Sequence, residues 1–228
     1  MPSSLASWRL PIVVRGLADA LAAVVLAPLC AACREPLAHP TRGAVCGTCW
    51  EAIEPPAIPA HEPIAPHITL ATAIGVYEGR LRDVIQALKY DARPTIARHL
   101  ARRMARAGAA VLAGADCVVP VPLHRSRERK RGFNQARELA RHLGAPVGDL
   151  LVRVRKTETQ ADLAAGRRHA NVRGAFALRA AVSVAGATVV LIDDVSTTGA
   201  TLNACAAVLR AAGAAEVRAL TAARAPLR

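Results

Sequence analysis

Two neighbouring aspartates that follow an apolar run are the sharpest chemical feature of this chain. Val189 to Ile192 form a short apolar segment typical of a buried strand, and Asp193 and Asp194 come directly after it. Glycine and hydroxyl side chains dominate the next seven positions, which are Val195, Ser196, Thr197, Thr198, Gly199, Ala200 and Thr201. Ligands of open parallel sheets bind at the carboxyl ends of the strands, so we expect a polar ligand here.

The turn after the aspartates has the composition of a phosphate site. Backbone amides of residues 196–201 would surround an anion at the start of a helix predicted over residues 200–212, where the helix dipole favours negative charge. Gly199 lets the backbone approach closely, and the two carboxylates are suited to accept hydrogen bonds from a sugar diol or to help hold Mg²⁺. No lysine follows the glycine, which excludes a Walker loop. A plain helix N-cap is the simpler alternative, but a cap needs neither two acids nor four hydroxyls.

Four of the six cysteines have the spacing of a metal site. They form two Cys-x-x-Cys pairs separated by twelve residues: Cys30, Cys33, Cys46 and Cys49. Each pair presents two thiolates from one tight turn, and two pairs complete a tetrahedron without an open position, so the site would be structural. Zinc is the favoured ion, while an iron–sulfur cluster and metal-free thiols remain alternatives. Cys117 and Cys205 are predicted to be buried thiols outside this site.

Two polar segments carry much of the positive charge. The first follows a strand predicted over residues 116–121, and we expect it to be a loop; its five cations in seven residues are Arg125, Arg127, Arg129, Lys130 and Arg131. The second segment, residues 156–171, has no hydrophobic period and is also predicted to be a loop. Arginine binds dense anions such as pyrophosphate bidentately. A solvated charge run or a nucleic-acid patch is the alternative.

The elements that must position these residues alternate between strands and helices from residue 70 onward. Hydrophobic patterning predicts strands over residues 70–77, 116–121, 151–154, 189–192 and 216–221, with residues 174–178 as a further candidate. Helices are predicted around Leu81 to Leu88 and over residues 95–112, 134–143 and 200–212. This alternation indicates an α/β fold, with a parallel sheet covered by helices on both faces.

A different organisation precedes residue 70. Residues 5–28 are predicted to form an amphipathic helix, which together with the cysteine segment makes up a module over residues 1–53. Five prolines within residues 54–69 indicate a stiff linker, so the α/β domain spans residues 70–228. Asp19 interrupts the apolar stretch that resembles a secretion signal, and no apolar run reaches the roughly 20 residues of a membrane span. We therefore expect a cytoplasmic protein without membrane insertion.

Composition and charge narrow the class of protein further. The chain has 228 residues, 53% of them hydrophobic, so it is long and apolar enough to fold around a core, which excludes a disordered protein. The net charge of +13 is unevenly placed, because residues 1–75 sum to −1 and residues 76–228 sum to +14. We therefore expect an anionic ligand at the α/β domain, and we do not expect the cysteine module to bind nucleic acid.

In combination, these motifs resemble those of one family. The segment from Val189 to Thr201 is similar to the phosphoribosyl pyrophosphate (PRPP) signature of type I phosphoribosyltransferases, and the rest of the chain resembles the ComF family of competence-associated proteins. The resemblance rests on the paired Cys-x-x-Cys module and, in chain order, on Leu88-Lys89-Tyr90, Val119-Pro120-Val121-Pro122, Arg131-Gly132-Phe133-Asn134-Gln135, Lys156-Thr157 with Gln160, Arg168, Asn171, Gly174, Phe176 and Ala223-Arg224. Each piece is short, but their order over residues 30–224 is specific.

The resemblance implies a type I phosphoribosyltransferase-like fold beside a small zinc-ribbon module, and an enzyme that displaces pyrophosphate from the anomeric carbon of PRPP. Asp193 and Asp194 would be the catalytic pair that holds the ribose hydroxyls, while the residues from Val195 to Thr201 would bind the 5′-phosphate. Pyrophosphate and the mobile loop that closes over it would involve Lys89, Arg131, Lys156 and Arg168. The implied cofactors are structural zinc and Mg²⁺ bound together with PRPP.

Partners are less defined than the donor. The resemblance leaves the acceptor unidentified and a homo-oligomer open, and the family's association with competence implies a link to DNA uptake. The rival hypothesis is a non-catalytic protein that senses PRPP or binds single-stranded DNA beside a DNA-uptake translocase, which the +14 charge permits. Against this rival, few aromatic side chains are available for base stacking. The N-terminal helix and the metal module are expected to form the hood over the acceptor.

Overall fold

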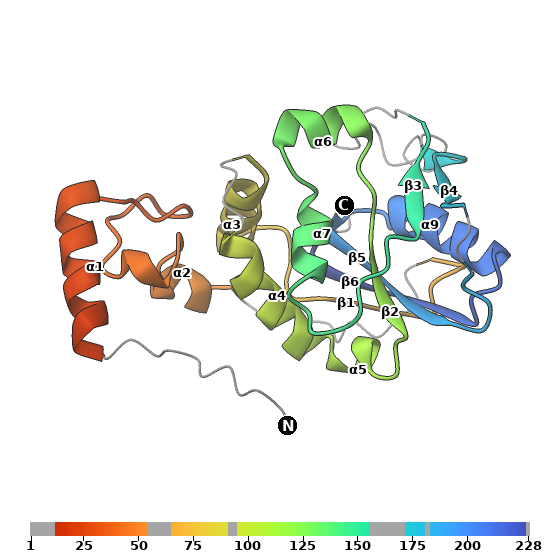
Figure 1. Cartoon of the computed structure of the whole chain (residues 1–228), viewed down its shortest axis with the longest axis horizontal. Coiled ribbons are helices and arrows are strands. Elements are labelled where there is room, and N and C mark those ends of the chain that lie inside the picture. The colour runs from red at the N-terminus through yellow and green to blue at the C-terminus, as the bar shows by residue number, and fades with distance from the viewer. Residues whose placement is uncertain (1–11, 54–64, 91–94, 156–171, 181–182, 227–228) are drawn as a thin grey trace, which may run out of the picture.

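A parallel sheet of four strands forms the centre of the molecule. The computed structural model describes residues 12–53, 65–90, 95–155, 172–180 and 183–226 (Figure 1). The strands lie in the order β1 (Leu70–Ala73), β6 (Glu216–Arg224), β5 (Thr188–Ser196) and β2 (Cys117–Pro120). All three neighbouring pairs are parallel, so the carboxyl ends of the four strands meet at one edge of the sheet. The predicted α/β fold with a parallel sheet is confirmed.

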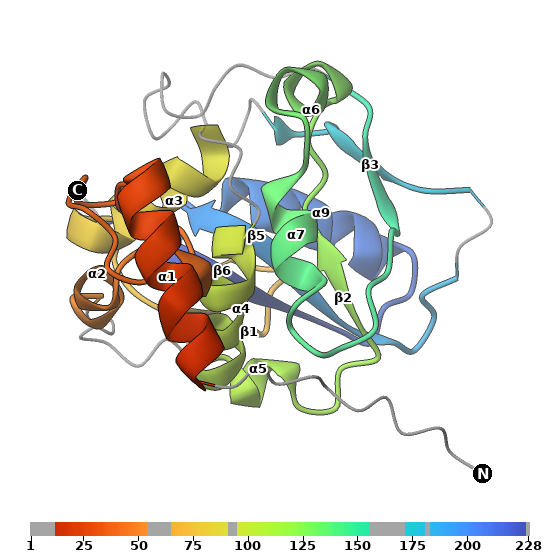
Figure 2. The ribbon, with the colours of Figure 1, turned by 60° about the vertical axis from the view of Figure 1, so that its left-hand side comes forward.

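Helices cover both faces of this sheet, as Figures 1 and 2 show. One face packs against α3 (Gly79–Tyr90), α4 (Thr95–Ala107) and α7 (Gln135–Ala140), and the other against α9 (Ala200–Ala211). Alternation along β5 divides the core accordingly, because Val190 and Ile192 join the first cluster whereas Val189 and Leu191 join the second. All four of these side chains are fully buried, which explains why the strand reads as a continuous apolar run.

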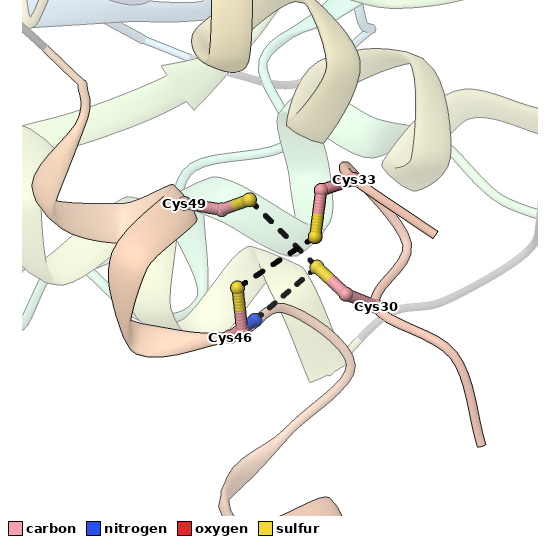
Figure 3. A group of neighbouring side chains, drawn as sticks. All are labelled: Cys30, Cys33, Cys46 and Cys49. Carbon is pink, nitrogen blue, oxygen red and sulfur yellow. Dashed lines mark hydrogen bonds between the residues drawn. The ribbon is translucent and has the colours of Figure 1, made fainter. Parts of the chain in front are cut away.

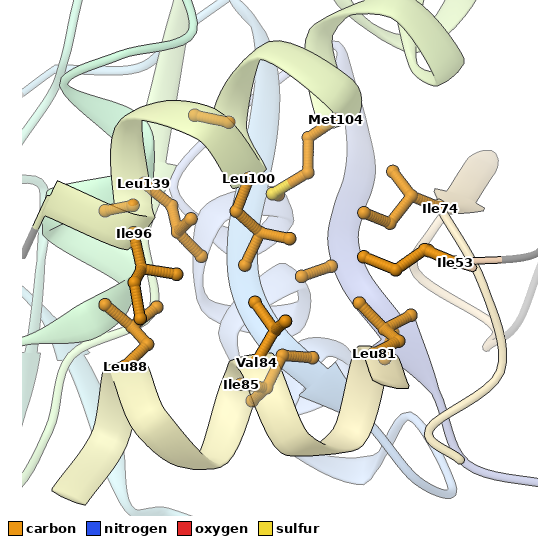
Figure 4. Packing of buried hydrophobic residues seen from close by; sticks show 14 of the residues in the cluster. Ile53, Ile74, Leu81, Val84, Ile85, Leu88, Ile96, Leu100, Met104 and Leu139 are labelled. Carbon is orange, nitrogen blue, oxygen red and sulfur yellow. The ribbon is translucent and has the colours of Figure 1, made fainter. Parts of the chain in front are cut away.

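Helices α3 and α4 pack against each other and together contribute ten buried residues to the first cluster (Figure 4). Leu81, Val84, Ile85 and Leu88 recur at helical spacing on α3, and they face Leu100 and Met104 of α4. The predicted single helix over residues 95–112 is two helices, since Gly108 separates α4 from α5 (Ala109–Leu112). A Cβ on Gly108 would lie 2.6 Å from Cδ1 of Leu220, so this glycine lets the helix end approach β6 closely.

The basic segment after β2 is a helix, and its prediction as a loop is wrong. Helix α6 (Arg125–Arg131) begins after His124, whose Nδ1 accepts a hydrogen bond from the backbone N–H of Ser126, and ends at Gly132 in the left-handed conformation. The five cations suggested a solvent-exposed loop, but the segment is a short helix that is capped at both ends. Two further strands, β3 (Leu151–Arg153) and β4 (Phe176–Leu178), pair antiparallel outside the main sheet.

The N-terminal module consists of α1 (Ile12–Leu26), a 3-10 turn η1 (Pro40–Arg42) and α2 (Gly47–Glu51). Asp19 attaches α1 to the turn, because its Oδ1 accepts hydrogen bonds from the backbone N–H and the hydroxyl of Thr41 at 2.8 and 2.6 Å. The opposite side of α1 exposes large apolar side chains, among them Leu17, Leu21 and Val24. Of the helix predicted over residues 5–28, residues 5–11 lie outside the described part of the chain. No described helix combines the length and the apolar character that a membrane crossing requires.

The module docks on the helical layer formed by α3 and α4 (Figures 1 and 2). The Trp50 ring of α2 stacks on the His99 ring with their centroids 5.8 Å apart, and the Arg103 guanidinium lies 5.4 Å from the Trp50 ring centroid. Ile53 follows α2 and lies beside Ile74 in the first core cluster. The module therefore shares one continuous core with the α/β domain. Of the predicted linker over residues 54–69, residues 54–64 fall outside the described ranges.

Candidate functional site

The two aspartates lie within the last four residues of β5, so the strand is longer than predicted. Its end pairs with the end of β6, with Val195 opposite Ala223 and Ser196 opposite Arg224. Asp194 is only 4% exposed, and its Oδ2 lies 2.9 Å from Nζ of Lys89 in the last turn of α3. The backbone N–H of Asp194 donates a hydrogen bond to Oδ1 of Asp193 at 2.8 Å. The structure thus brings together Lys89 and the aspartate pair, which are 104 positions or more apart in the sequence.

Burial and charge set the protonation of this cluster. Burial raises the pKa of Asp193 to about 8, and the neighbouring Asp194 carboxylate adds to the rise. Burial opposes the charge of Lys89, but the Asp194 carboxylate outweighs it and holds the pKa of the ammonium above its usual value. The result is one ion pair, between Lys89 and Asp194, beside a carboxyl group that is readily protonated near neutral pH. Such a group is able to donate as well as accept hydrogen bonds.

The turn between β5 and α9 has the geometry of an anion cradle. Gly199 adopts φ 72°, a left-handed conformation that favours glycine, and α9 begins at the next residue. Oγ1 of Thr198 is buried and has no hydrogen-bond partner among the described residues. Buried hydroxyls are normally paired, so an unpartnered one points to a ligand or water. The turn offers the first backbone amides of α9 and the positive end of its dipole to an anion, and the Thr198 hydroxyl belongs to the same turn.

One arginine that the sequence did not indicate, Arg153, lies within electrostatic range of Asp193. Arg153 is the last residue of β3, is 8% exposed, and its guanidinium lies 5.2 Å from the Phe176 ring centroid. Burial and the neighbouring positive charge of Arg127 lower the pKa of Arg153, while Asp193 acts in the opposite direction. Arg153 therefore lies within electrostatic range of both α6 and the end of β5. A charged residue at the inward position of a strand, two after the buried Leu151, was the available signal.

Of the remaining predicted cations, Arg131 lies in the described part of the chain, and its aromatic contact is with Tyr90. Arg131 is half-buried in α6, where its guanidinium lies 5.5 Å from the ring centroid of Tyr90 in α3. This contact connects α6 with the end of α3 that also carries Lys89. Lys156 and Arg168 lie outside the described residues, so their assignment to a mobile loop stays a prediction.

The four paired cysteines converge in the N-terminal module (Figure 3). Their sulfurs all lie within 4.8 Å of one another; Sγ of Cys30 and Cys49 are 3.9 Å apart, as are those of Cys33 and Cys46. A zinc ion with four thiolates at about 2.3 Å places them about 3.8 Å apart, so this arrangement has the size of a tetrahedral site. Cys205 is buried on α9, and Cys117 lies at the start of β2, away from this group.

The surroundings of Cys30 favour its thiolate, whereas burial raises the pKa of Cys46 and of Cys49 while no metal is bound. The backbone N–H of Cys46 donates to Sγ of Cys30 at 3.3 Å. Burial opposes ionisation of Cys30, but hydrogen bonds from the backbone N–H groups of Cys33, Cys46 and Ala32 lower its pKa to about 6. Four convergent cysteine sulfurs with backbone donors are a donor set that fits a soft cation such as zinc.

The module lies at one end of α3 and the aspartates at the other. Arg80, in the first turn of α3, has its pKa raised chiefly by the charge of Cys49, whereas Lys89 in the last turn contacts Asp194. Figure 1 shows α3 between the module and β5. The module is thus connected to the aspartates through α3, and its role as a hood over an acceptor stays a prediction.

The chain is similar to one known domain family and to several known proteins. The phosphoribosyl transferase domain family matches residues 129–227. Competence protein F of Haemophilus influenzae is 35% identical over 156 residues, covering 64% of this chain and 68% of that protein. DNA utilization protein YhgH of Salmonella typhimurium is 35% identical over 201 residues, covering 83% of this chain and 81% of the relative. YhgH of Escherichia coli is 32% identical over 217 residues and is covered over 94% of its length.

Proposed function

The chain belongs to the ComF family of competence-associated proteins, and on that premise we propose that it is a PRPP-dependent phosphoribosyltransferase. The observation that carries the proposal is the end of β5, where a buried aspartate held by Lys89 is followed by a left-handed glycine and a buried, unpartnered hydroxyl. A sugar phosphate fits the end of β5, because its hydroxyls would donate hydrogen bonds to the aspartates and its phosphate would bind at the turn before α9.

In the proposed complex, Asp193 and Asp194 receive the two ribose hydroxyls, and the 5′-phosphate lies on the amides and hydroxyls of residues 196–201. These contacts orient the anomeric carbon toward the acceptor. Pyrophosphate leaves from the opposite face toward the positive charges of Arg153 and Arg127. The ionised Asp194 carboxylate stabilises the positive charge that develops on the sugar ring in the transition state. If Mg²⁺ binds together with PRPP, it would neutralise part of the negative charge on the leaving pyrophosphate.

The four-cysteine site is proposed to hold one structural zinc ion. Four cysteine ligands close the coordination shell and leave no position for a substrate. The ion would fix the two loops that carry Cys30, Cys33, Cys46 and Cys49, and with them the Trp50 face that docks on α4. Zinc therefore supports the fold of the module and takes no part in the transfer step.

A second candidate function is binding without turnover. The names of the relatives refer to competence and DNA utilization, and residues 76–228 carry a net charge of +14. A protein that senses PRPP, or that binds single-stranded DNA during uptake, would use the same positive domain without transferring ribose phosphate. Base stacking has little support, because aromatic residues make up only 3% of the chain.

Pyrophosphate release separates these functions. The protein is incubated with PRPP and Mg²⁺ in the presence of a panel of purine, pyrimidine and amine acceptors, and pyrophosphate is measured. A transferase releases pyrophosphate with at least one acceptor and loses this activity in Asp194→Asn, while the exposed Asp149→Asn keeps it. PRPP binding without release under all conditions would instead establish the sensor. Salt-sensitive binding of oligothymidylate without any binding of PRPP would establish the DNA-binding function.

A further inference from the structure

A cavity of about 330 Å³ lies between the module and the helical layer, and its lining includes neither Lys89 nor the two aspartates. Its apolar floor comes from both parts of the chain, since Ile53 belongs to the module and Ile74 follows β1; Figure 4 shows them side by side. Arg103, Arg106 and Ala107 of α4 complete the lining. A concave apolar surface with a few convergent polar groups is the usual form of a small-molecule site, and this volume is at the lower end of the common range.

Among the residues that the structure describes, the charge on the α4 side of this cavity is positive. Helix α4 carries four arginines, Arg98, Arg102, Arg103 and Arg106, and no acidic residue. None of the four forms an ion pair among the described residues, although arginines of α3, α7 and β6 are paired with carboxylates. Burial together with the charges of Arg102, Arg98 and Arg103 lowers the pKa of His99, which lies on the same helix. Positive potential focused in a concave site attracts anions.

One of the two lining arginines is held in place before any ligand arrives. The Arg103 guanidinium lies 5.4 Å from the centroid of the Trp50 ring, and the same ring stacks on His99. A cation held over an aromatic face loses less conformational entropy when it binds an anion. Arg106 is exposed, one turn further along α4, and offers a second fork of donors to the same anion.

We propose that this cavity is a binding site for a small organic anion, with its phosphate or carboxylate on Arg103 and Arg106 and its apolar or aromatic body on Ile53 and Ile74. The ligand bridges the module and the α/β domain, because the floor and the arginines come from both. Its occupancy therefore stabilises the docked module. The proposal is independent of the PRPP site, which lies at the other end of α3.

The two tryptophans of the chain make this site directly observable. Trp8→Phe leaves Trp50 as the single tryptophan, next to one of the lining arginines. In this variant, phenyl phosphate is titrated while tryptophan fluorescence is recorded with excitation at 295 nm. We expect a saturable change, a stronger response than with inorganic phosphate, and a rise in the melting temperature. Benzoate in a parallel titration distinguishes a preference for phosphate from one for carboxylate.

A matched pair of arginines on α4 provides the control. In the Trp8→Phe background, Arg106→Gln removes a lining arginine and Arg102→Gln removes an arginine outside the cavity. Each substitution removes one positive charge. The proposal requires binding of phenyl phosphate to weaken about tenfold or more in Arg106→Gln and to change less than about twofold in Arg102→Gln. Asp194→Asn must leave this binding unchanged, which separates it from PRPP binding.

Three outcomes would overturn the proposal. The first is a fluorescence change that never saturates with phenyl phosphate. The second is equal weakening in Arg106→Gln and Arg102→Gln, which reports the net charge of the helix. The third is a fluorescence change of Trp50 with oligothymidylate that exceeds the change with phenyl phosphate and depends equally on Arg98, Arg102 and Arg106. This result would show that α4 binds an extended polyanion instead of a small anion.

Discussion

Lys89 Nζ lies 2.9 Å from Asp194 Oδ2, and this ion pair joins the last turn of α3 to the end of the central strand β5. Both side chains are largely buried, so each charge depends on the other. The pair orients a carboxylate next to the turn proposed to bind phosphate. It also connects the site to the helix whose first turn lies within electrostatic range of Cys49 in the module.

Replacement of Lys89 should show how far the buried charge of Asp194 depends on its partner. Lys89→Met leaves a buried carboxylate without its cation, and we expect a loss of about 3 kcal/mol in the free energy of unfolding at pH 7, measured by urea denaturation. The double variant Lys89→Met with Asp194→Asn removes both charges and should recover part of that loss. Additive effects of the two substitutions would show that the ion pair has no energetic role.

The protonation of Asp193 predicts an unusual pH dependence of stability. Because its pKa is about 8 in the folded protein and 3.8 in the reference state, the folded state binds more protons between these values. Stability should therefore fall as the pH rises from about 4 to 8, by at most about 1.4 kcal/mol per pH unit. Asp193→Asn removes this proton equilibrium. In thermal unfolding from pH 5 to pH 9, the stability of the variant relative to the wild type should increase as the pH rises. A stability difference that does not change with pH would contradict the prediction.

The cysteine module should depend on its metal. We expect about one zinc ion per chain by elemental analysis, lost in Cys49→Ser and retained in Cys205→Ser, because Cys205 lies outside the cluster. Chelation should unfold the module and release Trp50 from His99 and Arg103, which a red shift of tryptophan fluorescence in the Trp8→Phe variant reports. Bound iron with a visible absorption band would instead establish the iron–sulfur alternative.

Two glycines in helical surroundings should respond oppositely to alanine. A Cβ on Gly108 would meet Leu220 at 2.6 Å and the backbone oxygen of Met104 at 2.9 Å, so Gly108→Ala should destabilise the protein by about 1–3 kcal/mol. Gly16 lies in α1 with open space around it, so Gly16→Ala should stabilise the helix by up to about 1 kcal/mol. Urea denaturation of both variants tests this, and a neutral Gly108→Ala would contradict the close approach of α4 to β6.

The sequence predicts features that depend on local order. The apolar run before Asp193, the glycine that ends the turn and the spacing of the four cysteines each reflect short-range geometry, and the structure has the expected strand, turn, helix and cysteine cluster. The alternation of strands and helices likewise predicts the parallel sheet, because each crossover must cover a face.

Local sequence patterns do not predict contacts between elements that are distant in the chain. The pairing of Lys89 with Asp194 and the place of Arg153 depend on how α3 and β3 lie against β5. Helix α6 was missed because its charge suggested a loop, while its caps, His124 and Gly132, are weak signals in a sequence. The direction of α1 was also not predictable, since a single buried aspartate turns its apolar side outward.

Thr198→Val gives the most direct test of the PRPP site. Oγ1 of Thr198 is buried without a partner among the described residues, so its removal should leave the melting temperature of the free protein nearly unchanged. Titration calorimetry with PRPP and Mg²⁺ should show saturable binding to the wild type, weakened about tenfold or more in Thr198→Val, because a hydrogen bond to a charged phosphate is lost. The exposed Asp149→Asn should bind like the wild type. Absence of PRPP binding to the folded wild type, or equal affinity in Thr198→Val, would contradict a sugar-phosphate site between β5 and α9.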